Sequence, residues 1–134
     1  DLLTGNYASM AGFYDLENRD NKFFWKWTNG NGVIKFPLSG SGKKLLLKMF
    51  VERPPKDPEK LRILFNGHHL QPVVFSEGGL DLLQFVIQPG WLLNSGTQSL
   101  EFLNEPLNPA KAGISSDTRD LGVRIFSINL EAAK

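Results

Sequence analysis

The sequence predicts an all-β protein, an antiparallel two-sheet β-sandwich of the jelly-roll-like kind. Two observations support this prediction. About eight short strand signals recur along the chain with turn residues between them, the spacing expected of a sandwich. No stretch shows sustained helical periodicity. The length of 134 residues fits one domain, so we expect residues 1–134 to form a single unit. Because the chain begins with Asp1 rather than Met, we expect it to be excised from a longer protein.

The first predicted strands lie in the aromatic segment near the N-terminus. Residues 22–28 read Lys-Phe-Phe-Trp-Lys-Trp-Thr, and aromatic residues favour strands. Asn-Gly-Asn-Gly at 29–32 predicts a turn, and residues 33–38 then alternate between apolar and other residues. Pro37 cannot donate a hydrogen bond to a neighbouring strand, so this strand end is expected at a sheet edge or a bulge.

The middle of the chain predicts a central strand and a tight hairpin. In residues 44–53 every second residue is apolar, which predicts a strand with one apolar face. The residues of the opposite face are half apolar as well, which is typical of a central strand. Three prolines within 54–58 exclude a strand or helix interior there, so a loop is expected. An Asn-Gly pair joins the alternating residues 60–65 to a return strand at 69–75, because Asn-Gly tolerates the positive φ angles of a type I′ turn.

The remaining strands are expected at 82–88, at 97–104 and at the C-terminus, with a short loop or single turn at 91–96. A long irregular segment is expected at 105–120. In the final strand the apolar phase shifts after Ile125, which a β-bulge would explain. The residues expected to be mainly buried are Ile34, Phe36, Leu45, Leu47, Leu61, Ile63, Phe65, Phe85, Phe102, Ile125 and Ile128.

Composition argues against several classes of function. The net charge is +1, whereas nucleic-acid binders usually carry a strong basic excess, so nucleic acid is not an expected partner. The absence of cysteine excludes disulfides, thiolate zinc sites and a cysteine nucleophile. No run approaches the roughly 20 apolar residues of a membrane span, so this segment is not expected to insert into a membrane.

No residue pattern in the sequence indicates catalysis. The two histidines, His68 and His69, are strand neighbours that would face opposite sides, which disfavours one shared metal. No nucleophile elbow and no phosphate-binding glycine loop is present. The acidic residues mostly sit at strand ends and turns, where they usually cap or solvate rather than form a catalytic pair. We therefore expect no catalytic residues, no enzymatic activity in this domain and no cofactor.

Tryptophan residues are the candidates for a sugar-binding surface. Trp25 and Trp27 share one strand face, where they could stack on pyranose rings or, more commonly, pack in a core. Trp91 follows a Pro-Gly turn, where its ring could stand clear of the sheet. Trp27 is assigned a structural role. The predicted ligand-binding residues are Trp91, Trp25, Asp81, Asn94 and Gln98.

Four acidic residues near the two ends of the chain are weak candidates for a structural calcium site, because Ca²⁺ prefers several carboxylate and carbonyl oxygens on loops. The alternative, which we favour, is that they form salt bridges with Arg19 and Arg119. The four candidates are Glu17, Asp20, Asp117 and Asp120.

Several segments together resemble a known family. They are Gly-Phe-Tyr-Asp-Leu-Glu at 12–17, Phe-Trp-Lys-Trp-Thr at 24–28, Phe-Asn-Gly at 65–67 and Asp-Thr-Arg-Asp-Leu-Gly-Val at 117–123. This pattern resembles the accessory, carbohydrate-binding-like β-sandwich domain attached to bacterial membrane glycosyltransferases and cell-envelope polysaccharide enzymes. The resemblance covers most of the chain, and the segment at 117–123 is its most specific part.

The most specific segment also has a physical interpretation. In an extended segment Asp117 and Arg119 share a face, where a carboxylate–guanidinium pair would hold the long loop as it enters the last strand. Gly122 would allow the close approach or unusual backbone geometry needed at that corner. We therefore expect Asp117, Arg119 and Gly122 to be structural.

The resemblance implies a non-catalytic accessory domain that binds or positions glycan. Its implied partners are a glycan or polysaccharide and the remainder of the parent protein, and its implied location is periplasmic or extracytoplasmic, tethered to a membrane enzyme. The alternative is a structural or protein–protein interaction domain of the same enzyme with no sugar site. An exposed aromatic cluster would favour the first, and a contiguous apolar patch the second.

Overall fold

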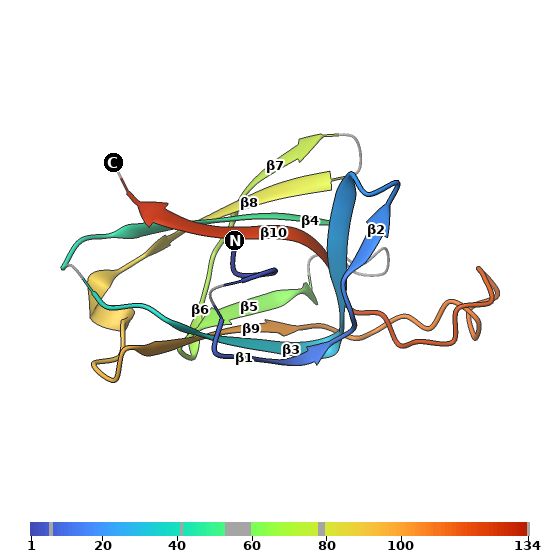
Figure 1. The fold of residues 1–134 in the computed structure, drawn as a ribbon, viewed down its shortest axis with the longest axis horizontal. Coiled ribbons are helices and arrows are strands. Elements are labelled where there is room, and N and C mark those ends of the chain that lie inside the picture. Colours follow the sequence, from blue (N-terminus) through green and yellow to red (C-terminus); the bar gives the residue numbers. More distant parts are fainter. Residues whose placement is uncertain (6, 41, 53–59, 78–79, 134) are drawn as a thin grey trace.

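A computed structural model describes residues 1–5, 7–40, 42–52, 60–77 and 80–133. Within these residues, ten strands form one antiparallel sheet that curls into a half-barrel (Figure 1). The predicted all-β, antiparallel fold is confirmed. The predicted proline loop at 54–58 lies outside the described residues. The described part of the chain has no helix with the length and hydrophobicity needed to cross a membrane.

The sheet has two halves that face each other across the core (Figure 1). The upper half contains β10, β4, β8 and β7, and the lower half contains β6, β5, β9 and the C-terminal part of β3, with β1 at its side. The strands are β1 (Ser9–Phe13), β2 (Glu17–Arg19), β3 (Phe23–Pro37), β4 (Leu45–Glu52), β5 (Arg62–Phe65), β6 (His68–His69), β7 (Val73–Glu77), β8 (Leu80–Ile87), β9 (Thr97–Leu103) and β10 (Arg124–Ala132).

The strand β3 runs through both halves and joins them. The predicted turn at 29–32 is wrong, because this segment lies inside the continuous strand β3. Gly30 has a φ of 102°, and a Cβ there would lie 2.8 Å from the Asn104 carbonyl oxygen. A Cβ on Gly32 would lie 2.9 Å from the Phe13 ring. These glycines therefore permit the strand to bend and pack closely instead of reversing the chain.

The pairing of β3 shows how the two halves are connected. Its N-terminal part pairs with β2 and β10, and its C-terminal part, residues 31–37, pairs with β9 and β1. In Figure 1 the N-terminal part of β3 descends from the upper half to the lower half beside β2. The upper and lower halves are therefore one hydrogen-bonded sheet.

The predicted Asn-Gly hairpin is confirmed, but its return strand is shorter than expected. Asn66 and Gly67 have φ angles of 47° and 83°, and they join β5 to β6. The predicted strand at 69–75 is wrong, because β6 ends at His69 and β7 begins at Val73 in the upper half. Pro72 lies between them, and proline cannot donate to a ladder.

Other predicted features are confirmed. The strand β4 is central, between β10 and β8. The register of β10 shifts between Ile125 and Ser127, which is the predicted bulge. The segment 105–120 is irregular, as predicted, and projects from the sheet (Figure 1). Its one β-type pairing with any described residue is an isolated bridge from Leu107 to Leu121, the residue that follows the segment. The N-terminal strands β1 and β2 were not predicted.

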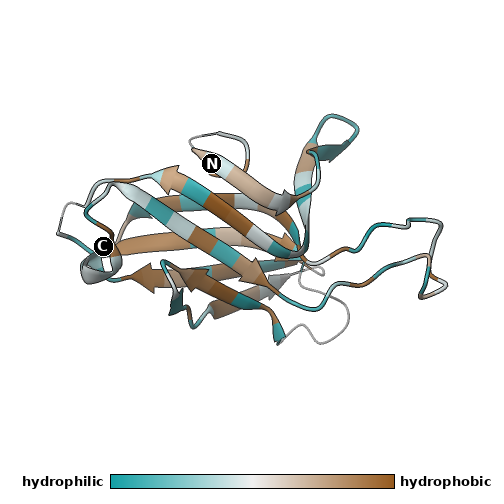
Figure 2. Ribbon diagram, turned by 90° about the horizontal axis from the view of Figure 1, so that it is seen from below, coloured by the Kyte–Doolittle hydropathy of each residue, from teal (hydrophilic) through white to brown (hydrophobic). Residues whose placement is uncertain are grey.

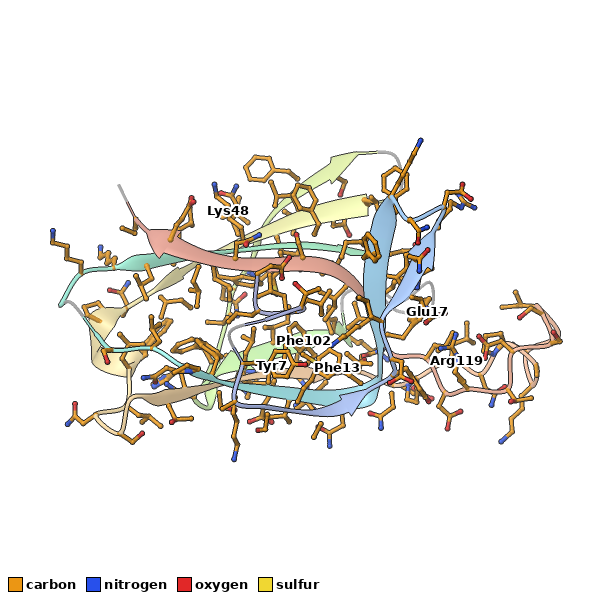
Figure 3. The ribbon with its side chains drawn as sticks, viewed as in Figure 1. Tyr7, Phe13, Glu17, Lys48, Phe102 and Arg119 are labelled. Atoms are coloured by element: carbon orange, nitrogen blue, oxygen red, sulfur yellow. The ribbon has the colours of Figure 1, made fainter. Side chains whose placement is uncertain are left out.

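The core lies between the two halves of the sheet. All predicted core residues are buried except Leu45 and Leu61, which are half-buried and pack against the core. Phe13 meets the fully buried Phe102 edge to face, with ring centroids 6.1 Å apart (Figure 3). Along the strands of the lower half, hydrophilic and hydrophobic residues alternate (Figure 2), because successive side chains point to opposite faces.

Candidate ligand-binding pocket

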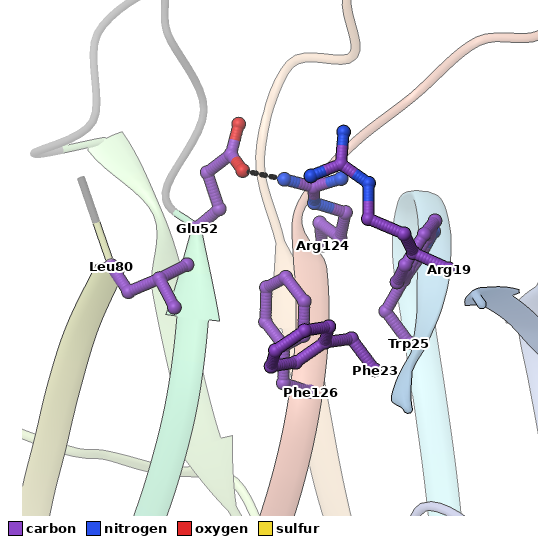
Figure 4. A pocket seen from close by; sticks show the side chains of 7 residues that line it. All are labelled: Arg19, Phe23, Trp25, Glu52, Leu80, Arg124 and Phe126. Atoms are coloured by element: carbon purple, nitrogen blue, oxygen red, sulfur yellow. Dashed lines mark hydrogen bonds and ion pairs between the residues drawn. The ribbon is translucent and has the colours of Figure 1, made fainter. Parts of the chain in front are cut away.

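A pocket of about 640 Å³ opens where β2, β3, β10, β4 and β8 come together (Figure 4). We call it the Arg–Trp pocket. In Figure 4 the charged groups of the pocket lie at one end, and two phenylalanine rings lie below them. The pocket therefore combines a polar rim with an apolar wall. Its lining residues are Arg19, Phe23, Trp25, Glu52, Leu80, Arg124 and Phe126.

Arg124 is placed in this pocket by strand register. It is the cross-strand neighbour of Trp27 on β3 and of Glu52 on β4, and such neighbours on one face lie close enough to interact. It forms an ion pair with Glu52. Its guanidinium carbon lies 5.1 Å from the centre of the Trp25 ring and 5.0 Å from that of Phe126. These contacts hold the guanidinium against an aromatic wall.

Arg19 supplies the second guanidinium of the pocket. It ends β2 and is the cross-strand neighbour of Phe23, a residue that is 61% exposed. The Arg19 side chain is exposed and makes no hydrogen bond or ion pair with any residue that the structure describes. The pocket therefore has one paired guanidinium and one guanidinium open to a ligand.

Two buried donors beside the pocket lack acceptors. Trp25 Nε1 and Arg124 Nε have no hydrogen-bond partner among the described residues. Buried donors without partners are uncommon and unfavourable, because they lose their hydrogen bonds to water. The carboxylate of Glu52 is engaged by Arg124. The Trp25 and Arg124 nitrogens are themselves inaccessible, so the donors that the pocket presents to a ligand are those of the exposed Arg19 guanidinium.

Trp91 lies elsewhere, in the 3-10 turn Pro89–Trp91 at the far end of β8. Its ring is half-buried, packs against the core and stacks on His68 at a centroid distance of 5.0 Å. One face of the ring is therefore covered. The Trp91 carbonyl accepts a hydrogen bond of 2.8 Å from Asn66 Nδ2. The ring lines a smaller pocket of about 300 Å³ with mostly apolar surroundings, among them Leu70, Val73 and Phe85.

The structure does not bring the residues predicted to accompany Trp91 into one site. Gln98 is fully buried, and its side chain bonds to Asn66, to both backbone groups of Leu93 and to the Leu38 carbonyl. In this structure Gln98 is not placed to contact a ligand, because it is buried and its side-chain hydrogen bonds are made within the protein. Its role is to hold the turn that follows Trp91.

The two other companions of Trp91 also lie apart from each other. Asp81 is 8% exposed and hydrogen-bonded to Ser76, at the opposite end of β8 from Trp91. At about 3.3 Å per residue, this separation exceeds the reach of one sugar ring. Asn94 is exposed in the loop after Trp91. Of the predicted ligand-binding residues, only Trp25 lines the Arg–Trp pocket.

The predicted Asp117–Arg119 pair is present and includes a second carboxylate. Arg119 Nη2 lies 2.9 Å from Asp117 Oδ2, and Arg119 Nη1 lies 3.0 Å from Glu17 Oε2 (Figure 3). The guanidinium also lies 5.1 Å from the centre of the Tyr14 ring. Hydrogen bonds from Arg119 lower the pKa of Asp117, and those with Asp117 and Glu17 raise the pKa of Arg119. The predicted pair is present, and its structural role stays a prediction.

The four calcium candidates do not gather around one point. Glu17 and Asp117 face Arg119, and Asp120 accepts a hydrogen bond from Asn108 Nδ2 at 3.2 Å. Asp20 is exposed in the turn between β2 and β3. Among the residues described, no group of three or more acidic or histidine side chains is arranged to hold a metal ion.

Gly122 is packed tightly against the strand β3. A Cβ at this position would lie 2.2 Å from Thr28 Oγ1 and 2.6 Å from the Gly30 backbone nitrogen. The Gly122 nitrogen donates a 2.7 Å hydrogen bond to the Thr28 carbonyl, and the Val123 nitrogen donates one of 3.1 Å to Thr28 Oγ1. The predicted close approach of the backbone at Gly122 is confirmed.

Sequence reasoning identified Trp25 but missed the charged residues around it. The visible signal was the pair of tryptophans at alternate positions, with Phe23 before them. Arg19, Glu52 and Arg124 are distant in sequence, and only strand pairing brings them to the same ring. Without the register of β10, Arg124 is one of several unremarkable basic residues.

Comparisons with known proteins concern the fold alone. No protein-family model matches the chain, and a search of curated proteins finds no match. A solved structure of the plant Receptor-like Kinase FER has a similar fold, with a TM-score of 0.51 and 11% sequence identity. The similarity covers 99% of this chain and 36% of the FER chain. Identity this low carries no information on function.

Proposed function

We propose that this chain is a non-catalytic accessory domain of a bacterial glycosyltransferase or surface-polysaccharide system that binds or positions glycan. The proposed site is the Arg–Trp pocket. We further propose that the curled sheet is a jelly-roll-like sandwich, because core residues from both halves pack against each other. The proposed location is extracytoplasmic, beside the remainder of the parent protein.

The observation that carries the proposal is the meeting of aromatic rings and guanidinium groups in one open pocket. An exposed ring such as Phe23 offers apolar area to the C–H face of a sugar. Arg19 can donate hydrogen bonds to hydroxyl oxygens. The choice of glycan over other oxygen-rich ligands rests on the resemblance to envelope glycosyltransferase domains. A shallow site of this kind should bind with a Kd of about 10 μM to 1 mM.

The test is a titration of the domain with a panel of envelope glycans, followed by amide chemical-shift mapping. We expect shifts at residues 23–25 and 124–126, and loss of binding in Trp25→Ala. The matched control is Trp91→Ala, which should retain binding. If no glycan shifts any resonance at millimolar concentration, the proposal is wrong. If Trp91→Ala removes binding and Trp25→Ala does not, the site lies at Trp91.

An interaction domain without a sugar site is the second candidate. The outer face of the upper half exposes several apolar side chains, including Phe75 at 54%, Val73 at 58% and Phe50 at 47%. Phe75 and Phe50 flank Leu82 in the ladder, so this surface is contiguous. Phe75→Lys should then weaken association with the separately expressed remainder of the parent protein, measured by co-purification. Retained association would argue against this role for the face.

A further inference from the structure

We infer that the glycan bound in the Arg–Trp pocket is acidic and that Arg19 binds its carboxylate. This inference rests on the proposed function and adds the chemical class of the ligand. It depends on the balance of charge in the pocket, on the position of Arg19 beside an exposed ring, and on the planar geometry of the guanidinium group.

The described residues that line the pocket carry a net positive charge. Among the described lining residues there are two guanidinium groups, Arg19 and Arg124, and one carboxylate, Glu52. Glu52 is paired with Arg124, so its charge is already compensated. The charge of Arg19 has no counterion among the residues that the structure describes. A neutral sugar would leave this charge uncompensated, whereas a carboxylate would compensate it.

The position of Arg19 matches the shape of a uronic acid. Arg19 is the cross-strand neighbour of Phe23, and both residues line the pocket with Trp25. A pyranose that stacks its C–H face on an aromatic ring carries its C5 carboxylate outward, near the plane of the sugar ring. In Figure 4 the Arg19 guanidinium lies at the charged end of the pocket, above the two phenylalanine rings, so a carboxylate directed toward that end would meet it.

The guanidinium geometry favours a carboxylate over a hydroxyl. Arginine presents parallel N–H groups that bind both oxygens of a carboxylate, and such charge-assisted pairs are stronger than neutral hydrogen bonds. Arg119 already binds carboxylates of this chain in this way, and Arg124 is paired with Glu52 through Nη2, but Arg19 binds no carboxylate among the described residues. Among these three residues, Arg19 is the one whose guanidinium group is open to a ligand.

The experiment compares acidic probes with their neutral esters. Short oligomers of galacturonic, mannuronic and guluronic acid, and the fully methyl-esterified form of each, are titrated against the domain by chemical-shift mapping. We expect at least one acid to bind about three- to tenfold more tightly than its ester, the gain that one partly exposed charge-assisted pair supplies. Added salt should reduce this preference, because the pair is screened.

Two variants test whether Arg19 causes the preference for the acid over its ester. Arg19→Gln should bring the affinity for the acid down to that for its ester, because the glutamine amide can still donate a hydrogen bond but carries no charge to pair with the carboxylate. The matched control is Arg62→Gln, which removes the same charge from β5 at a different pocket and should keep the preference. Circular dichroism of both variants should match that of the unmodified chain, since both side chains are exposed.

The outcomes separate this inference from the proposed function. If esters or neutral envelope glycans bind at the pocket as tightly as the acids, the inference is wrong and glycan binding stands. The same holds if Arg19→Gln keeps the preference for acid. If neither the acids, the esters nor the neutral panel shifts any pocket resonance, the proposed function fails, and the inference fails with it.

Discussion

Arg119 Nη1 lies 3.0 Å from Glu17 Oε2, an ion pair that spans 102 positions of the chain. It joins the long irregular segment 105–120 to β2. The same strand β2 carries Arg19, two residues after Glu17, at the rim of the Arg–Trp pocket. The pair therefore holds in place the strand that supplies the open guanidinium of the proposed site.

Arg119→Ala should lower the free energy of unfolding by about 1 kcal/mol, because it removes two partly exposed ion pairs and a cation–π contact with Tyr14. Chemical denaturation measures the change. The matched control is Arg19→Ala, which removes the same side chain from an unpaired position and should change stability by less than about 0.5 kcal/mol. Equal effects of the two variants would show that the Arg119 pairs do not stabilise the fold.

Asp117 should make the stability of the domain sensitive to acid. Hydrogen bonds from Arg119 lower its pKa from the ordinary value of 3.8. Because the folded pKa lies below the unfolded pKa, the stabilisation is present above about pH 4 and is lost as pH falls through the folded pKa. Asp117→Asn should therefore be less stable than the unmodified chain at neutral pH, and the difference should shrink towards pH 2. A difference independent of pH would contradict this account.

Gly122→Ala should destabilise the fold by about 2–4 kcal/mol, because its Cβ would overlap Thr28 Oγ1 and the Gly30 backbone. Thermal unfolding measures the loss. Gly90→Ala is the control, since a Cβ there meets nothing within 4 Å and should change stability by less than about 0.5 kcal/mol. If Gly122→Ala is as stable as Gly90→Ala, the close packing of Gly122 against β3 does not contribute to stability.

The variant Gln98→Ala tests whether Gln98 stabilises the fold or binds a ligand. The buried amide satisfies the backbone of Leu93 and Leu38, so its loss leaves part-buried backbone groups unpaired and should cost about 1–3 kcal/mol. Affinity for a glycan that binds at the Arg–Trp pocket should not change, because Gln98 does not line it. The control is Gln71→Ala at an exposed position. Weaker binding by folded Gln98→Ala would show that the site lies near Trp91 after all.

Local sequence patterns predicted much of the fold. Alternation identified the faces of β4 and β5, and the Asn-Gly pair identified the hairpin after β5, because these features depend on neighbouring residues. The same local reasoning failed at 29–32, where glycines that normally signal a turn allow β3 to bend through the sheet. It also missed β1 and β2, which have few apolar alternations.

The sequence by itself determined the all-β class, the buried residues of the central strands and the pairing of Asp117 with Arg119. Each follows from side-chain alternation or from two residues on one short segment. Only the tertiary structure decided that Arg19, Trp25 and Arg124 share a pocket and that Glu17 pairs with Arg119. Those contacts depend on which strands pair and in what register, and register is set by how the whole curled sheet buries its core.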